Sequence, residues 1–149
     1  MPITRSIFRE SVAVRNEIVA DHLGSGTRKR KFEPIDVKSI VVTKGEETGG
    51  AIITYEYKIE YQLAEPKNKN LGEIKIIGEL FFVDKASVVA DLVSEWKKNK
   101  KIKSEHALYI LNYAFREAQL EALEQSKKVS LPPPFDLPRV KLKSKSSAS

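Results

Sequence analysis

The chain has 149 residues, no cysteine and a formal net charge of +6 at pH 7. Its length suits one domain with its own hydrophobic core, and the lack of cysteine excludes disulfides, thiolate metal sites and cysteine nucleophiles. No apolar run is long enough to cross a membrane. The opening residues, MPITRSIFRE, lack the apolar stretch of a secretory signal. We therefore expect a cytoplasmic protein.

The first forty residues predict two strands separated by a loop. Residues 5–19 mix apolar and polar positions and predict an imperfect strand, bulged or changing face near Glu10 and Ser11. Residues 20–31, ADHLGSGTRKRK, predict a loop because two glycines and a basic run meet there. Residues 33–43 are rich in Ile and Val and predict the second strand.

Two longer strands are expected next. Residues 51–63 carry apolar side chains at the odd positions and mostly polar ones at the even positions, which predicts one buried and one wet face. Residues 71–83 alternate in the same way but are apolar on both faces near their end, at Ile77, Phe81 and Val83. That second apolar face needs a helix, a partner or a ligand to cover it.

Two helices are expected to close the chain. Asp84 can cap the segment ASVVADLVSEWKKN, and Ser104 can cap a longer helix that the prolines from Pro132 onward terminate. The expected apolar face of the longer helix is formed by Leu108, Leu111, Phe115, Ala118 and Ala122 and widened by Ile110, Ala114 and Leu123. The predicted class is α+β: a four-stranded antiparallel sheet, then two C-terminal helices and a Pro-rich extended segment. We expect one domain over residues 1–142 and a basic tail over 143–149.

No catalytic, cofactor-binding or metal-binding constellation is present in the sequence. His22 and His106 stand in no metal-ligand spacing. Residues 24–29, GSGTRK, lack the register of a phosphate-binding loop. Glu56 and Glu60 alternate with lysine on one strand face, where cross-strand charge pairing explains them better than acid–base catalysis. We expect a protein that is not an enzyme.

Three tyrosines, Tyr55, Tyr57 and Tyr61, share one strand face. They are expected either in a core or interface with hydroxyls at its rim, or in an amphipathic groove for peptide. Stacking of single-stranded RNA is a weaker interpretation, because Lys58 points to the opposite face.

The layout resembles the SecB-like family of export chaperones. The segments that carry the resemblance are the short turns around residues 45–50 and 65–70, the strand ending GELFFV at 78–83, NYAFRE at 112–117 and LPPPFDLP at 131–138. The resemblance implies a four-stranded antiparallel sheet, dimers and commonly tetramers, and an apolar groove that holds unfolded polypeptide in extended form without ATP.

Two functions follow, with a third left open. The first is a SecB-like, ATP-independent chaperone or polypeptide-binding protein. Its groove candidates are Phe8, Tyr55, Tyr57, Tyr61, Ile77, Phe81, Val83, Phe115 and Phe135. The second is a basic protein that contacts RNA or the ribosome. Its polyanion-contact candidates are Arg28, Lys29, Arg30, Lys31, Lys97, Lys98, Lys100, Lys101, Lys141 and Lys143. The third is an oligomeric scaffold without a client.

Overall fold

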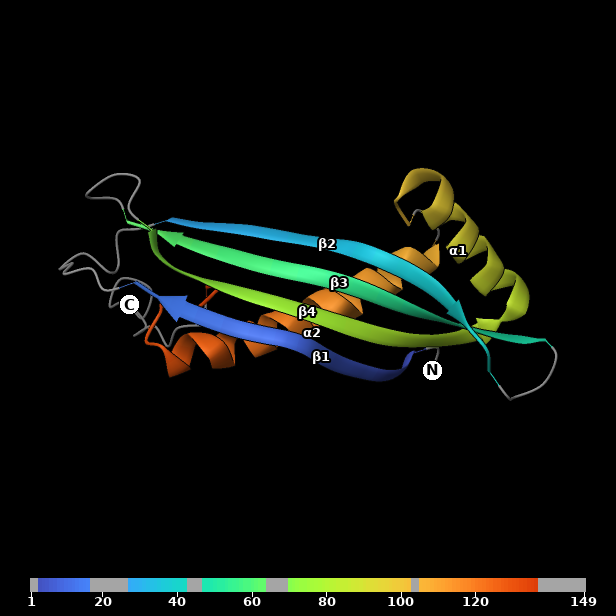
Figure 1. Ribbon diagram of the computed structural model, residues 1–149, viewed down its shortest axis with the longest axis horizontal. Helices are drawn as coiled ribbons and strands as arrows, with labels where there is room; N and C mark the ends of the chain where they lie inside the picture. The colour runs from blue at the N-terminus through green and yellow to red at the C-terminus, as the bar shows by residue number, and fades with distance from the viewer. Residues whose placement is uncertain (1–2, 17–26, 43–46, 64–69, 103–104, 137–149) are drawn as a thin grey trace, which may run out of the picture.

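The computed structural model describes residues 3–16, 27–42, 47–63, 70–102 and 105–136. Its elements are β1 (Ile3–Arg15), β2 (Thr27–Ile40), β3 (Thr48–Gln62), β4 (Asn70–Lys85), α1 (Ala86–Asn99) and α2 (Glu105–Lys128). The strands form one sheet in the order β1-β4-β3-β2, and every neighbouring pair is antiparallel (Figure 1). The predicted α+β class is confirmed.

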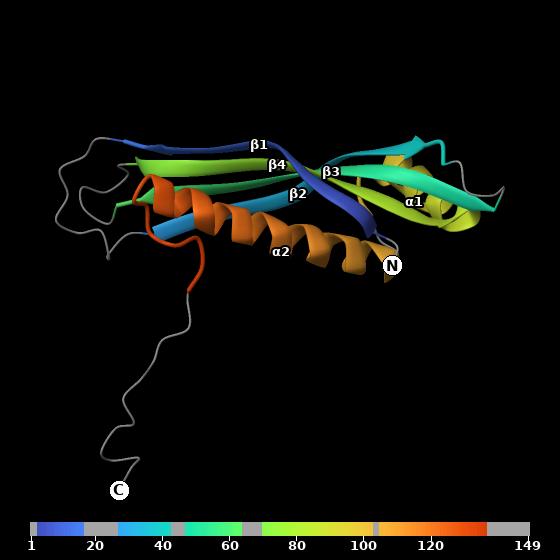
Figure 2. The same ribbon diagram turned by 90° about the horizontal axis from the view of Figure 1, so that it is seen from below.

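The core lies on one face of the two central strands. The odd residues of β3 and the even residues of β4 are buried there, among them Ile53, Ile59, Ile76 and Phe82. α2 runs obliquely across this face along the length of the sheet (Figure 2). α1 adds Val89, Leu92, Val93 and Trp96 to the same core. The alternation predicted for residues 51–63 is confirmed.

The opposite face of the sheet is not covered by either helix and carries charges of both signs. Lys75 lies 3.9 Å from Glu56 and 4.0 Å from Glu10 on the neighbouring strands. Lys58 lies 4.0 Å from Glu60 along β3. Glu56 thus has the predicted cross-strand partner, whereas the ion pair of Glu60 lies within β3. Since side chains alternate along a strand, we call this the open face and the other the helix face.

Some strand boundaries differ from the predicted ones. β2 begins at Thr27, so the basic run 28–31 lies in a strand and not in a loop, because pairing with β3 extends the shorter strand. The irregularity predicted near Glu10 is confirmed as a register shift between Phe8 and Glu10. The cap predicted at Asp84 is wrong, since the first backbone amide of α1 donates to the Glu47 carbonyl at 2.7 Å instead.

The face of α2 that meets the sheet includes the predicted Ile110, Ala114, Ala118 and Ala122 but not all of the larger residues expected there. The buried side chains are mostly small, namely Ala107, Ile110, Ala114, Ala118 and Ala122. Leu108, expected on the buried face, is 68% exposed, and Leu111 and Phe115 are half-buried. Small residues allow α2 to approach a sheet surface already filled by tyrosine and isoleucine, which places the larger apolar residues at the margins.

α2 ends in a Schellman motif and not at the prolines. Ser130 has a φ of 57°, in the left-handed region. The Leu131 amide donates to the Ser126 carbonyl at 2.9 Å, and the Ser130 amide donates to the Lys127 carbonyl at 3.4 Å. The prediction that the prolines stop the helix is therefore wrong, because the helix has already ended when Pro132 is reached. The cap predicted at Ser104 lies outside the described residues.

Candidate functional site

The three tyrosines of the expected groove lie in the core. Tyr55, Tyr57 and Tyr61 are buried on the helix face, and burial raises the pKa of each phenol because the charged phenolate would be desolvated. Their hydroxyls form no hydrogen bond with any residue that the structure describes. These rings can touch a peptide only where the elements above them move, so their place in a groove stays a prediction.

Phe115 lies in an aromatic cluster at the seam between α2 and β2. Its ring centroid is 5.3 Å from that of Phe32 and 5.8 Å from that of Tyr57, with edge-on geometry in both pairs. Phe32 also lies 5.6 Å from Tyr55. Sequence reasoning missed Phe32 because residues 20–31 were expected to be a loop and the strand only began at residue 33. Its pairing with Tyr57 across β2 and β3 places it in the seam.

Ile77, Phe81 and Val83 lie on the open face and are half-buried. The guanidinium of Arg5 stands 5.4 Å from the centroid of the Phe81 ring, and Ile52 is the partner of Phe81 on β3. The sheet therefore separates two sets of predicted groove residues. One set lies beneath α2, and the other lies on the opposite surface, so they cannot form one groove.

The segment Leu131–Asp136, which we call the proline strap, is fixed to β2 by two arginines. Arg28 donates to the Pro133 carbonyl at 2.8 Å and pairs with the Asp136 carboxylate at 2.7 Å. Arg30 donates to the Pro134 carbonyl at 3.2 Å. Leu131 and Pro134 are buried, while the groove candidate Phe135 is half-buried. The strap therefore closes the end of the core beside β2.

The first basic cluster is divided between the two faces because strand side chains alternate. Arg28 and Arg30 serve the strap. Lys29 and Lys31 pair in register with Glu60 and Lys58 across the open face, and Lys31 lies 3.3 Å from Glu33. Four residues that looked like one patch in the sequence therefore do not form one surface.

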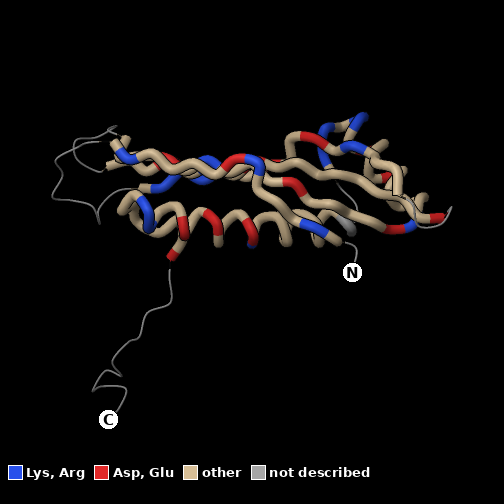
Figure 3. Tube along the Cα trace, turned by 60° about the horizontal axis from the view of Figure 1, so that its bottom comes forward, with Lys and Arg blue, Asp and Glu red and all other residues tan. Residues whose placement is uncertain are grey.

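Of the other two predicted basic clusters, one lies at the end of α1 and the other lies outside the described residues. Lys97, Lys98, Lys100 and Lys101 are exposed at the end of α1, and Figure 3 shows Lys and Arg gathering there. Lys100 lies over the Trp96 ring at 5.8 Å from its centroid. Lys141 and Lys143 lie outside the described residues, as does His22. The described basic residues do not form one continuous polyanion surface, and the RNA hypothesis gains no support from them.

The free edge strand β1 exposes three large apolar side chains. Phe8, Val12 and Val14 are exposed by 38%, 46% and 50%. After the register shift between Phe8 and Glu10, residues 11–14 of β1 include no proline and no charged side chain, whereas the other edge strand, β2, carries Pro34 and several lysines. Edge strands are usually guarded by such residues, because their unpaired backbone groups can take up another strand. β1 therefore presents an edge that can accept extended chain.

The strap contacts predict a measurable loss of stability for Arg28→Ala. We expect the free energy of unfolding to fall by about 1–2 kcal/mol, because one charged donor serves both a backbone carbonyl and a carboxylate. Its partner Asp136 is exposed, which keeps the effect below that of a buried pair. Urea unfolding measures the loss. Lys29→Ala, one residue away on the open face, is the matched control and should change stability by less than about 0.5 kcal/mol; equal losses in the two variants would contradict the role of the strap.

No group of three or more His, Asp or Glu side chains is placed to hold a metal ion in the part of the chain that the structure describes. Within the same residues, neither helix combines the length and apolarity that a membrane crossing requires.

Comparison with known proteins gives a structural match only. No known protein family and no curated protein sequence matches the chain. A SecB-like chaperone of Mycobacterium tuberculosis, solved in complex with a ChAD peptide from the HigA1 antitoxin, is similar in structure. The sequences are 14% identical, the TM-score is 0.49, and the match covers 94% of this chain and 90% of that one.

Proposed function

We propose that this protein binds extended, apolar polypeptide without nucleotide, as an additional strand beside β1. The observation that carries the proposal is the edge of β1 at residues 11–14, which holds no proline and no charged residue and exposes Val12 and Val14 by 46% and 50%. An extended peptide would pair with the free backbone groups of β1, and its side chains would meet Val12 and Val14 on one face of the sheet and Phe8 on the other.

The two faces of β1 would offer different contacts to such a peptide. Val12 and Val14 pair with Lys75 and Glu73 of β4 and so belong to the open face. Phe8 pairs with Gly78 and belongs to the helix face, because the register shift after Phe8 changes the alternation. A client with apolar residues at every second position fits Val12 and Val14 on one side.

The expected affinity is moderate. Burial of apolar surface contributes about 25 cal/mol per Å², and much of this is offset by the loss of chain freedom on binding. Weak, reversible contacts suit a protein that holds unfolded chains and releases them. A second copy of the chain could occupy the same edge, and we include a dimer or tetramer and a cytoplasmic location in the proposal.

Suppression of aggregation is the direct test. Heat-denatured citrate synthase is followed by light scattering without nucleotide, with and without a several-fold molar excess of this protein. We expect the protein to slow aggregation and the Val12→Ser/Val14→Ser variant to lose most of that effect. Both sites are exposed, so the fold should tolerate the change.

The matched control is Leu108→Ser/Leu120→Ser, which removes two exposed apolar side chains from α2, where Leu120 is 52% exposed. It should retain the activity of the unaltered protein. Equal activity of both double variants, or no suppression by the unaltered protein, would contradict the proposal.

A further inference from the structure

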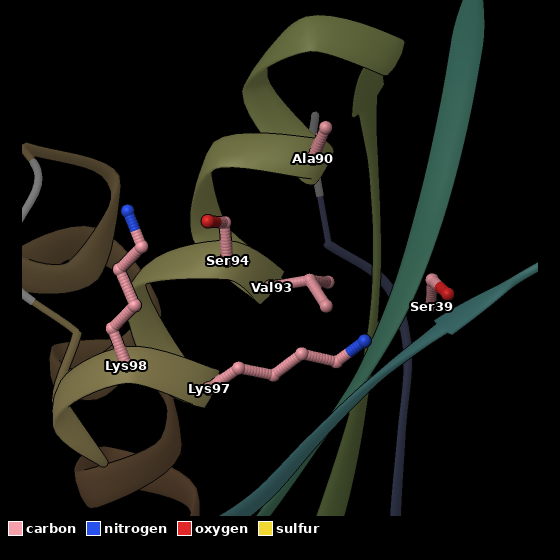
Figure 4. Close-up of a pocket in the computed structure, with 6 residues that line it drawn as sticks. All are labelled: Ser39, Ala90, Val93, Ser94, Lys97 and Lys98. Atoms are coloured by element: carbon pink, nitrogen blue, oxygen red, sulfur yellow. The ribbon is translucent and has the colours of Figure 1, made fainter.

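A hollow of about 540 Å³ lies between α1 and β2. It is lined by Ser39, Ala90, Val93, Ser94, Lys97 and Lys98. β2 is the edge strand opposite β1, so the hollow is separate from the edge proposed to bind clients. In Figure 4, Val93 and Ala90 point from the helix toward the strand, and Lys97 extends across the gap toward the strand that carries Ser39.

One helix face supplies most of the lining. Its five lining residues follow the spacing i, i+3, i+4, i+7 and i+8 from Ala90, which places them along one side of α1. Val93 is 8% exposed and forms an apolar floor, while alanine and serine leave space above it. The hollow therefore has room for an apolar side chain.

The rim of the hollow carries positive charge that no described acid neutralises. Lys97 and Lys98 are exposed, and neither forms an ion pair with a residue in the described part of the chain. Arg28 and Arg30, in contrast, hold the strap, and Lys31 lies beside Glu33. The charge available to a partner is thus concentrated next to an apolar floor.

We propose that this hollow binds an acidic peptide segment, with an apolar side chain against Val93 and Ala90 and carboxylates beside Lys97 and Lys98. Opposite charge supplies the selection between peptides. A nucleic acid strand fits less well, because single-strand binding relies on stacking against aromatic rings and none lines the hollow.

Fluorescence anisotropy with labelled peptides tests the proposal. The probe is a short peptide in which leucine alternates with aspartate. We expect Lys97→Glu/Lys98→Glu to weaken its binding about ten-fold or more, since two attractive contacts become repulsive. Lys127→Glu/Lys128→Glu at the end of α2 makes the same change in net charge and should leave binding within about two-fold. Acids at the C-terminal end of a helix can disturb folding, so Lys97→Gln/Lys98→Gln serves as a second variant. It removes both positive charges without adding acids and should also weaken binding.

Further measurements distinguish binding in the hollow from binding by charge alone, from nucleic acid binding and from binding at β1. Ala90→Phe, which fills the hollow from an exposed position, should weaken binding, and so should serine in place of leucine in the probe. Equal binding of the serine probe would overturn the proposal, because charge alone would then explain it. Tighter binding of oligouridylate with the same lysine dependence would overturn it in favour of nucleic acid. The Val12→Ser/Val14→Ser variant should bind the probe normally; loss of binding there would place the peptide at β1 instead.

Discussion

Replacing Ala118 by leucine should lower the free energy of unfolding by about 2–3 kcal/mol. Ala118 is fully buried where α2 crosses the sheet, and the surface beneath it is filled by large side chains such as Tyr55 and Ile76. Three additional carbon atoms would have to lift the helix or displace a ring from its place in the core. Urea unfolding followed by circular dichroism measures the change.

Leu120→Ala is the control for that experiment. Leu120 lies on the same helix but is 52% exposed. Its truncation should change stability by less than about 0.5 kcal/mol, since it opens no cavity. Were Leu120→Ala the more damaging of the two, the burial of Ala118 and the exposure of Leu120 described above would be wrong.

Gly78→Ala should be at least as destabilising, by about 3 kcal/mol. A Cβ at residue 78 would overlap with the hydroxyl oxygen of Tyr55 and with the ring carbon that bears it. No atom pair tolerates such an overlap, and the Tyr55 ring is buried and cannot swing away. The glycine is required because a tyrosine lies flat across the neighbouring strand.

A double variant tests this explanation directly. Tyr55→Leu shortens the side chain that meets residue 78, so Gly78→Ala should cost much less in that background than in the unaltered protein. Gly49→Ala is the matched glycine control, because its Cβ would meet its nearest neighbours, in Ala86 and Val89, at 3.1 Å. Additive losses in Gly78→Ala/Tyr55→Leu would falsify the proposed contact.

The sheet could be predicted because its pattern is local. Strict alternation over residues 51–63 marks one buried face whatever packs on it, and the order of strands before helices limits the fold class. α2 could not be placed in the same way. The expected face of the helix mixes large and small apolar residues; Ala114 and Ala118 are buried as predicted, whereas Leu108 is exposed because the filled surface of the sheet leaves no room for it.

The candidate site was less predictable. The start of β2 is set by pairing with β3, which outweighs the low strand preference of the basic run 28–31. Once that run is a strand, alternation alone predicts that Arg28 and Arg30 share a face. Their partners in the strap depend on the turn at Ser130, whose left-handed conformation has no strong signal in the sequence because glycine is the usual residue there.

The sheet order has a consequence for how the chain folds. β1 pairs only with β4, so that Ile3 meets Phe82 and Ala13 meets Ile74, while β2, β3 and β4 are joined as neighbours by successive hairpins. Contacts between residues distant in sequence form slowly, because a long loop must close first. β1 therefore has to wait for the β2–β3–β4 meander, and its docking is expected to be the late step that limits the folding rate.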